Sequence, residues 1–145
     1  MQLLLQRVTT ASVSIDNQEV GKIANGLLVF LGVEKQDTQA HADKLLHKLL
    51  NYRVFADAED KMNLSLLDIQ GELLIISQFT LAADTKKGLR PSFSTAASPA
   101  DGESLYQYFV SQAQASGLKI ATGKFGADMQ VSLVNDGPVT FLLNN

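Results

Sequence analysis

Residues 71–79 read Gly71-Glu72-Leu73-Leu74-Ile75-Ile76-Ser77-Gln78-Phe79, the most apolar strand-like segment of the chain. Four aliphatic residues follow one another, so both faces of an extended segment would be apolar. Strands of this kind lie in the centre of a sheet whose two faces are both covered. We therefore predict a central strand over residues 72–79 that ends in polar residues.

The segment before this strand predicts a helix from Asp37 to about Arg53. Its apolar residues recur every three or four positions, which places them on one helical face. They are Ala42, Leu45, Leu46, Leu49 and Leu50. Asp37 or Thr38 can cap the helix by accepting hydrogen bonds from free backbone N–H groups. The two histidines, His41 and His47, are six residues apart and share no helical face, so we expect both at the surface.

Residues 2–33 have the composition and the turn signals of strands. Asp16-Asn17 predicts a turn between two of them. Asn25-Gly26 stands before the apolar run 27–31, and an Asn-Gly pair in that position is typical of a hairpin. We therefore expect residues 2–33 to form an antiparallel meander, in which each strand pairs with the next.

The segment after the central strand predicts a long loop and a second helix. Residues 82–97 show no periodicity, and an irregular connection of about 16 residues is often functional. Ser98-Pro99 then favours a helix start, because serine caps free N–H groups and proline fits the first turn. Gly117 suits the end of this helix.

The C-terminal residues predict two strands, 128–134 and 139–143, around Asn135-Asp136-Gly137-Pro138. Asp-Gly is a turn signal, but the proline after it cannot donate to a strand ladder. A tight hairpin with a rigid exit is the favoured interpretation. The alternative is a cis Gly137–Pro138 bond, a form found in only about 5–6% of X–Pro bonds, which would turn two carbonyls toward a partner.

Length and composition restrict the chemistry. The chain has 145 residues, so we expect a single domain over residues 1–145. It has no cysteine, which excludes disulfides, thiolate nucleophiles and cysteine–metal clusters. Two histidines cannot supply a three-histidine metal site within one subunit, and we expect no metal and no cofactor. The net charge of −3 argues against binding nucleic acid through bulk positive charge, but it allows local phosphate contacts.

No segment predicts membrane insertion or secretion. The apolar runs 27–31 and 73–76 are far shorter than the ~20 residues that a spanning helix needs. The N-terminus has no basic region before its apolar residues and no cleavage site after them. The sequence therefore favours a cytoplasmic protein that does not bind membranes.

The first candidate site is Ser77-Gln78-Phe79-Thr80-Leu81, at the end of the central strand. Backbone N–H groups at a strand end are free to point at a ligand oxygen. The alternative is a strand that simply ends in solvent, and these residues alone do not decide between the two. A serine–histidine–acid triad would have to use a histidine from the helix surface, which argues against it.

Basic residues and one methionine are further candidates. Lys86, Lys87 and Arg90 in the long loop, and Arg7 near the N-terminus, could bind phosphates. A short basic run is more often a solvated face, which is the favoured interpretation from spacing alone. Met129 alternates with polar residues in a predicted strand, so core packing is its expected role.

Three separated motifs together resemble one family. They are Ser77-Gln78-Phe79-Thr80-Leu81, Lys87-Gly88-Leu89-Arg90-Pro91-Ser92-Phe93 and Asn135-Asp136-Gly137-Pro138-Val139-Thr140. Their order and the surrounding sequence, over essentially the whole chain, are similar to those of the bacterial D-aminoacyl-tRNA deacylases. No motif position departs from the pattern of that family.

The resemblance implies an α+β fold, with a compact β-barrel-like antiparallel or mixed sheet and two main helices packed on it. It also implies a homodimer with active sites at the subunit interface. The expected activity is hydrolysis of the ester that joins a D-amino acid, or glycine, to the 3′-terminal adenosine of tRNA. The 3′ end of D-aminoacyl-tRNA is the expected partner, and DNA is not.

The resemblance also assigns roles to individual residues. Ser77, Gln78, Phe79 and Thr80 would line the catalytic pocket. Gly137 and Pro138 would form a cis bond that enters the partner subunit's site and leaves no room for the side chain of an L-amino acid. Arg7 would brace this motif, and Met129 would contact the adenosine. Lys86, Lys87 and Arg90 would bind the substrate.

These roles imply catalysis without a side-chain base. Water or the ribose 2′-hydroxyl would supply the nucleophile, and N–H groups near Phe79 and Thr80 would stabilise the oxyanion. Thr80 as nucleophile is the competing proposal, although it has no evident base. The alternative function is a non-catalytic oligomeric RNA- or nucleotide-binding protein.

Overall fold

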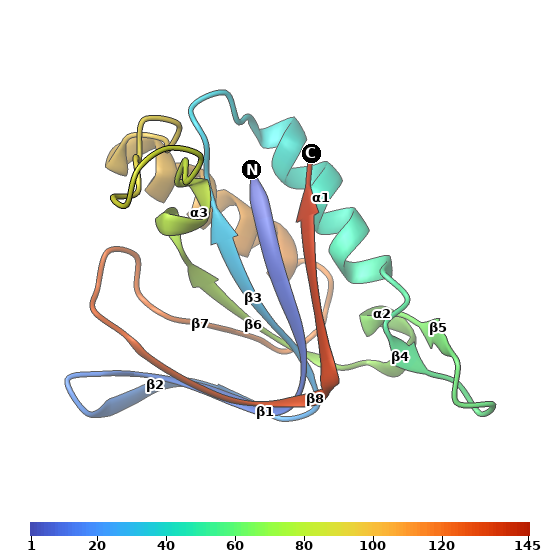
Figure 1. The fold of residues 1–145 in the computed structure, drawn as a ribbon. Helices are drawn as coiled ribbons and strands as arrows, with labels where there is room; N and C mark the ends of the chain where they lie inside the picture. The colour runs from blue at the N-terminus through green and yellow to red at the C-terminus, as the bar shows by residue number, and fades with distance from the viewer.

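The computed structural model describes residues 1–145, and its strands form one curled mixed sheet with helices packed against it (Figure 1). The strands of this sheet are β1 (Gln2–Ile15), β2 (Gln18–Ile23), β3 (Gly26–Gly32), β6 (Glu72–Ser77), β7 (Ile120–Thr122) and β8 (Gln130–Asn144). A separate hairpin consists of β4 (Phe55–Ala56) and β5 (Met62–Leu64). The helices are α1 (Gln39–Asn51), α2 (Leu66–Ile69), α3 (Pro99–Gln114) and the 3₁₀ helix η1 (Phe79–Ala82).

The long strand β1 organises the sheet because three strands pair with it. β8 runs antiparallel to it from the pair Gln2–Asn144 to the pair Ser14–Gln130. β3 pairs with its first half and β2 with its second half, both antiparallel. β6 then adds parallel to β3, and β7 adds parallel to β6. This arrangement confirms the expected α+β fold with a barrel-like mixed sheet.

The predicted meander over residues 2–33 is wrong. The turn at Asp16-Asn17 does join β1 to β2, and both residues have positive φ angles, as such a hairpin turn requires. Asn25-Gly26 forms no hairpin, and neither residue has a positive φ angle. The chain runs straight on instead, so β2 and β3 lie end to end along β1 and do not pair with each other.

The predicted C-terminal hairpin is also wrong. Residues 130–144 form one strand, because both of its halves pair with β1. The register shifts between Gln6 and Val8, whose partners in β8 are Thr140 and Asn135. Four residues, 136–139, therefore face a single residue of β1, and this bulge accommodates a proline that cannot donate to the ladder.

The two faces of the sheet pack against two hydrophobic clusters. The larger cluster joins Leu3 and Leu5 of β1 to the apolar sides of α1 and α3. The smaller cluster lies inside the curl of the sheet and includes Val8 and Val13 of the same strand. The register shifts near Val8 let one strand serve both clusters. The prediction of a central strand with two buried faces is confirmed, since all four residues 73–76 are buried.

Both main helices are confirmed, and their caps explain their bounds. The five apolar residues predicted for α1 are all buried. Thr38 caps it by accepting from the His41 N–H, and His41 completes the cap through its own side chain. Ser98 caps α3 by accepting from the Asp101 N–H. None of the helices is both long and apolar enough to cross a membrane.

Gly26→Ala is expected to destabilise the fold strongly. A Cβ at this position would lie 2.7 Å from the Glu72 backbone nitrogen and closer still to its carbonyl oxygen. Because backbone atoms cannot move aside cheaply, the free energy of unfolding in urea should fall by about 3 kcal/mol or more. Gly102→Ala is the matched control, since its Cβ would meet nothing closer than 3.5 Å. It lies in α3 and should leave stability unchanged or raise it by up to about 1 kcal/mol. Equal stabilities for the two variants would contradict this account.

Because the Tyr106 hydroxyl is buried, the folded protein is expected to lose stability at high pH. Burial raises the pKa of its hydroxyl to about 12, from an ordinary value of about 10. The folded chain therefore holds this proton more tightly, so the stabilisation is complete below pH ~10 and is lost as the pH rises toward ~12. In Tyr106→Phe, the free energy of unfolding should fall less steeply over this range. An equal fall in both proteins would show that Tyr106 does not contribute.

Candidate functional site

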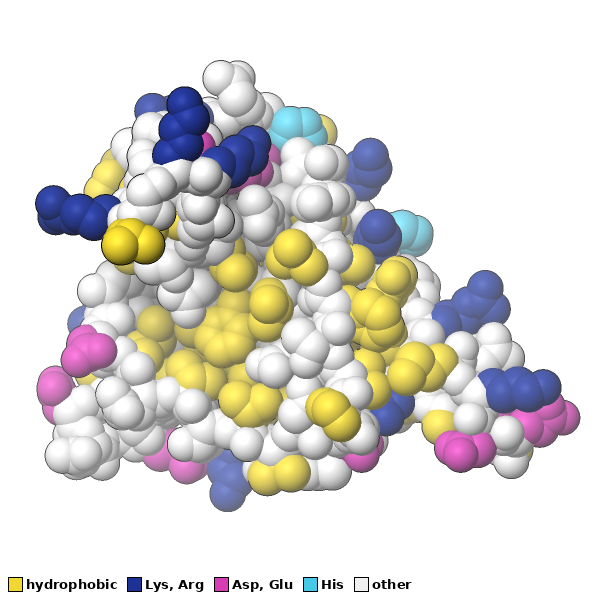
Figure 2. Space-filling view, viewed as in Figure 1, with side chains coloured by type: hydrophobic (Ala, Val, Ile, Leu, Met, Phe, Trp, Pro, Cys, Tyr) yellow, Lys and Arg dark blue, Asp and Glu magenta, His cyan; other side chains and the backbone are white.

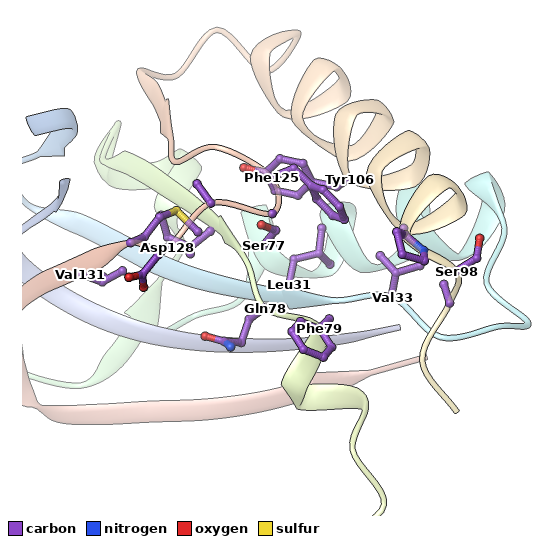
Figure 3. A pocket seen from close by; sticks show the side chains of 17 residues that line it. Leu31, Val33, Ser77, Gln78, Phe79, Ser98, Tyr106, Phe125, Asp128 and Val131 are labelled. Carbon is purple, nitrogen blue, oxygen red and sulfur yellow. The ribbon is translucent and has the colours of Figure 1, made fainter. Parts of the chain in front are cut away.

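A cavity of about 470 Å³ opens at one edge of the sheet, beside the first turns of α3 (Figure 3). β3 and β6 are parallel, so their carboxyl ends meet at this edge, where Leu31 pairs with Ser77. Such an edge is a common place for ligand sites in sheets with parallel strands. The loop before β8 closes the cavity on the other side with Phe125 and Met129.

The walls of the cavity are mostly apolar. The rings of Tyr106 and Phe125 lie together on one side, with centroids 5.8 Å apart, and Phe79 lies on the opposite side (Figure 3). The Tyr106 hydroxyl donates to the Ile75 carbonyl oxygen at 2.9 Å. This bond and the raised pKa of Tyr106 keep its proton in place near neutral pH, so Tyr106 shapes the wall and is no acid or base there.

Three of the four residues predicted as catalytic line the cavity, namely Ser77, Gln78 and Phe79. β6 ends at Ser77, two residues earlier than predicted, and the helix η1 begins at Phe79. The first N–H groups of a helix have no partner within it. The Leu81 N–H finds the Gln78 carbonyl, which leaves the N–H groups of Phe79 and Thr80 free at this corner.

Thr80 lies outside the cavity wall and is exposed. Its hydroxyl oxygen accepts a hydrogen bond from the Gln78 side-chain amide at 2.6 Å. An amide cannot take a proton from a hydroxyl, and no carboxylate or imidazole bonds to Thr80. The structure therefore provides no base to activate Thr80.

Met129 belongs both to the hydrophobic packing and to the cavity wall. It is half-buried and packs against the smaller hydrophobic cluster, as its position in the sequence suggested. It also lines the cavity. Its sulfur lies so close to Gly123 that a Cβ there would overlap it.

Gly137–Pro138 forms a cis bond on the bulge of β8, where both residues are exposed. Arg7 holds this bulge, since its Nε donates to the Asp136 carbonyl oxygen at 2.9 Å and its Nη1 to the Val54 carbonyl oxygen at 2.7 Å. Neither Gly137 nor Pro138 lines the cavity of its own chain. The structure thus brings Arg7 together with the motif and keeps both away from Ser77–Phe79.

Asn135 holds the same bulge from within. Its Oδ1 accepts from the Val139 N–H at 2.6 Å, and its Nδ2 donates to the Thr140 hydroxyl at 3.0 Å. Gly137 has a φ angle of +146°, and a Cβ there would lie 2.9 Å from the Val139 nitrogen and 3.3 Å from Nη2 of Arg7. No other residue fits this position without displacing its neighbours.

The basic residues of the long loop stand outside the cavity. Lys86, Lys87 and Arg90 are all exposed, and none of them forms an ion pair. The loop is folded back on itself, because Asp84 and Ser92 exchange two backbone hydrogen bonds. Figure 2 shows Lys and Arg side chains gathered over this loop, beside a face with many hydrophobic side chains.

Sequence reasoning missed Tyr106, Phe125 and Asp128, which also line the cavity. The helix start at Ser98 was predicted, and a residue two turns further along α3 faces the same side. That spacing could have indicated Tyr106. Nothing in the local pattern around Phe125 or Asp128 points to the cavity, because these residues lie in an irregular segment whose position depends on β7 and β8.

Comparison with known proteins gives a consistent result over the whole chain. A family described as D-Tyr-tRNA(Tyr) deacylase matches residues 4–144. The chain is 67% identical over 143 residues to a D-aminoacyl-tRNA deacylase of Pseudoalteromonas translucida, covering 99% of each chain. It is 68% identical over 143 residues to the protein of that name from Pseudomonas fluorescens, again covering 99% of each.

A solved structure agrees with these relatives. It is described as the c-Myc DNA Unwinding Element Binding Protein and is 40% identical to this chain, with a TM-score of 0.95 over 100% of this chain and 99% of the other. The match therefore extends to the whole curled sheet and both main helices. On the family match and the full-length relatives together, the chain belongs to the D-Tyr-tRNA(Tyr) deacylase family.

Proposed function

We propose that this protein hydrolyses the ester that joins a D-amino acid, or glycine, to the 3′-terminal adenosine of tRNA. The observation that carries the proposal is the near full-length identity of 67% to a protein named D-aminoacyl-tRNA deacylase. The cavity supports it, because its size is that of a small-molecule site and its walls suit a nucleobase. In this proposal the adenine lies against Met129 and Phe125, and the ester lies at Ser77–Thr80.

The reaction that we propose uses backbone and water. An aminoacyl ester is already activated, so a positioned water can attack its carbonyl carbon without a strong base. The carbonyl oxygen becomes an oxyanion, which the free N–H groups of Phe79 and Thr80 would stabilise. The tetrahedral intermediate then collapses, the bond to the ribose 3′-oxygen breaks, and that oxygen takes the proton that the attacking water gives up. The products are the D-amino acid and the free 3′ end of tRNA.

The proposed selectivity needs a second subunit. Gly137–Pro138 is exposed, held firmly by Arg7 and Asn135, and absent from the cavity of its own chain. A rigid, exposed motif of this kind suits insertion into the cavity of a partner subunit in a homodimer. There its carbonyl groups would occupy the space that the side chain of an L-amino acid needs, while glycine and D-amino acids would fit.

Lys86, Lys87 and Arg90 would bind phosphates of the 3′ strand of the tRNA in this proposal. They are exposed and unpaired on the loop that follows η1, in a chain whose net charge is −3. Contact with the RNA would therefore be confined to this loop and the cavity. In this proposal the protein would act in the cytoplasm, where charged tRNA is used.

Nucleic-acid binding without turnover is the second candidate function. The observation in its favour is the solved structure that is 40% identical to this chain, because that protein is described as binding a DNA element. A binding protein of this kind would bind charged and uncharged tRNA equally and release no amino acid. The next experiment distinguishes the two candidates.

Release of tyrosine from D-tyrosyl-tRNA, but not from L-tyrosyl-tRNA, is the expected result. The protein should raise the rate for the D-ester at least about a thousandfold above the spontaneous rate, as backbone oxyanion stabilisation typically does. Quenched-time-course assays with the two labelled esters measure both rates. Equal cleavage of the two would refute the steric selection, and no cleavage of either would refute the enzyme.

Thr80→Ala is expected to keep the D-specific activity within about tenfold of the wild-type value. The substitution removes the hydroxyl and its bond from Gln78, but it leaves the Thr80 backbone N–H in place. The ratio kcat/KM for D-tyrosyl-tRNA, with circular dichroism as a folding control, measures the effect. A loss of about 10⁴-fold or more in a folded variant would instead indicate that Thr80 is the nucleophile.

A further inference from the structure

Two aromatic side chains remain exposed at the mouth of the cavity. Phe79 is 58% exposed and Phe93 is 39% exposed. Their ring centroids are 5.0 Å apart, with an angle of 52° between the ring planes. Phe79 lines the cavity, whereas Phe93 belongs to the loop that follows η1. The pair therefore extends the apolar surface of the cavity outward onto the loop.

The position of Phe93 is well defined, although the loop has no regular secondary structure. On one side, Ser92 exchanges two backbone hydrogen bonds with Asp84. On the other side, the Phe93 carbonyl accepts from the Ala96 N–H at 3.1 Å, and the Ala97 N–H donates to the Val33 carbonyl at 3.0 Å. These bonds tie the aromatic residue to the end of β3. The exposed ring is thus presented by a supported backbone.

The charge around the pair is positive. Lys86, Lys87 and Arg90 lie three to seven residues before Phe93, and all are exposed. The one acidic residue of the loop, Asp84, accepts a hydrogen bond from the Lys86 backbone N–H and pairs with none of the three cations. The loop is drawn in olive in Figure 1, and Figure 2 shows the dark blue side chains gathered over it.

We propose that Phe79 and Phe93, together with these cations, form a second subsite for the nucleotides that precede the terminal adenosine. A base would stack on the exposed rings, and the adjoining phosphates would meet Lys86, Lys87 and Arg90. Proteins that bind single-stranded nucleic acid combine these two features, aromatic platforms and a positive groove. The inference rests on the proposed function, because it takes the cavity as the adenosine site.

A nucleic acid suits this surface better than a second copy of the chain. A contact between two copies that used the rings near a symmetry axis would bring two sets of cations together, and like charges at close range oppose association. A single strand carries one negative charge per nucleotide and one flat base, which complements both features. The free 3′ end of a tRNA is such a strand.

The test compares two esters of D-tyrosine, one on adenosine and one on the trinucleotide cytidylyl-cytidylyl-adenosine. The wild-type protein should have the higher kcat/KM for the trinucleotide ester. Phe93→Leu keeps an apolar side chain but removes the ring. It should therefore lower the ratio of kcat/KM for the trinucleotide ester to kcat/KM for the adenosine ester by about tenfold. Phe93→Tyr keeps the ring and should keep the ratio. Leu89→Ala is the matched control, an exposed apolar residue of the same loop, and should not change it.

Several outcomes would overturn the inference. An unchanged ratio in Phe93→Leu would do so, and so would an equal loss on both esters, which would indicate a purely structural role. Sedimentation velocity tests the remaining alternative. If Phe93→Leu dissociates a dimer and leaves the ratio unchanged, the two rings form a subunit contact and not a nucleotide subsite.

Failure of the proposed function would be recognised separately. In that case the wild-type protein hydrolyses neither ester, and binding of the unesterified trinucleotide decides about the subsite. Fluorescence anisotropy should then give about tenfold weaker binding for Phe93→Leu than for the wild type. Equal binding by the two proteins would overturn the subsite.

Discussion

Parallel pairing of β3 with β6 begins where Gly26 lies directly against the backbone of Glu72, and most of the architecture follows from this contact. Parallel neighbours cannot be joined by a tight turn, so the chain must cross over one face of the sheet. α1 and α2 lie in that crossover and bury the face beneath them. The same pairing brings the carboxyl ends of both strands to one edge, and the cavity opens there. A side chain at position 26 would separate the two strands and thereby the cavity walls.

The chemistry of the cavity follows from which groups reach this edge. Tyr106 carries the strongly shifted hydroxyl, and its raised pKa keeps the proton on the oxygen that donates to Ile75. The Thr80 hydroxyl is bonded only to the Gln78 side-chain amide. Backbone N–H groups at the start of η1 are the donors that this edge offers to an oxyanion, and Ser77, Gln78 and Asp128 add polar side chains to the wall. A substrate with an activated ester and its own hydroxyl groups suits such a site, because it brings part of the reaction chemistry with it.

The two halves of the proposed site lie at different positions along β1. Ser77–Phe79 stand beside the end of β3 that pairs with the beginning of β1, whereas Arg7 and Gly137–Pro138 stand at the bulge further along it. One chain cannot bring them together without breaking the β1–β8 ladder. A symmetric pair of chains could do so twice, and this is the physical reason to expect a dimer. In such a dimer, the bulge braced by Arg7 and Asn135 would offer the partner a firmly held surface.

Local pattern was enough to predict the two main helices and the central strand, because each depends on residues close together in the sequence. Composition alone excluded thiol chemistry and a three-histidine site within one subunit. The apolar spacing and the caps Thr38 and Ser98 act within a few residues of each other. The motifs also indicated the family.

Only the tertiary structure decided that Asn25-Gly26 and Gly137–Pro138 form no hairpins, since both outcomes depend on pairing with β1. Gln6 lies beside Thr140, 134 residues away, and no local preference encodes such a contact. The cavity wall at Phe125 has the same origin, because Phe125 lies between β7 and β8 and reaches the wall only when the sheet has formed.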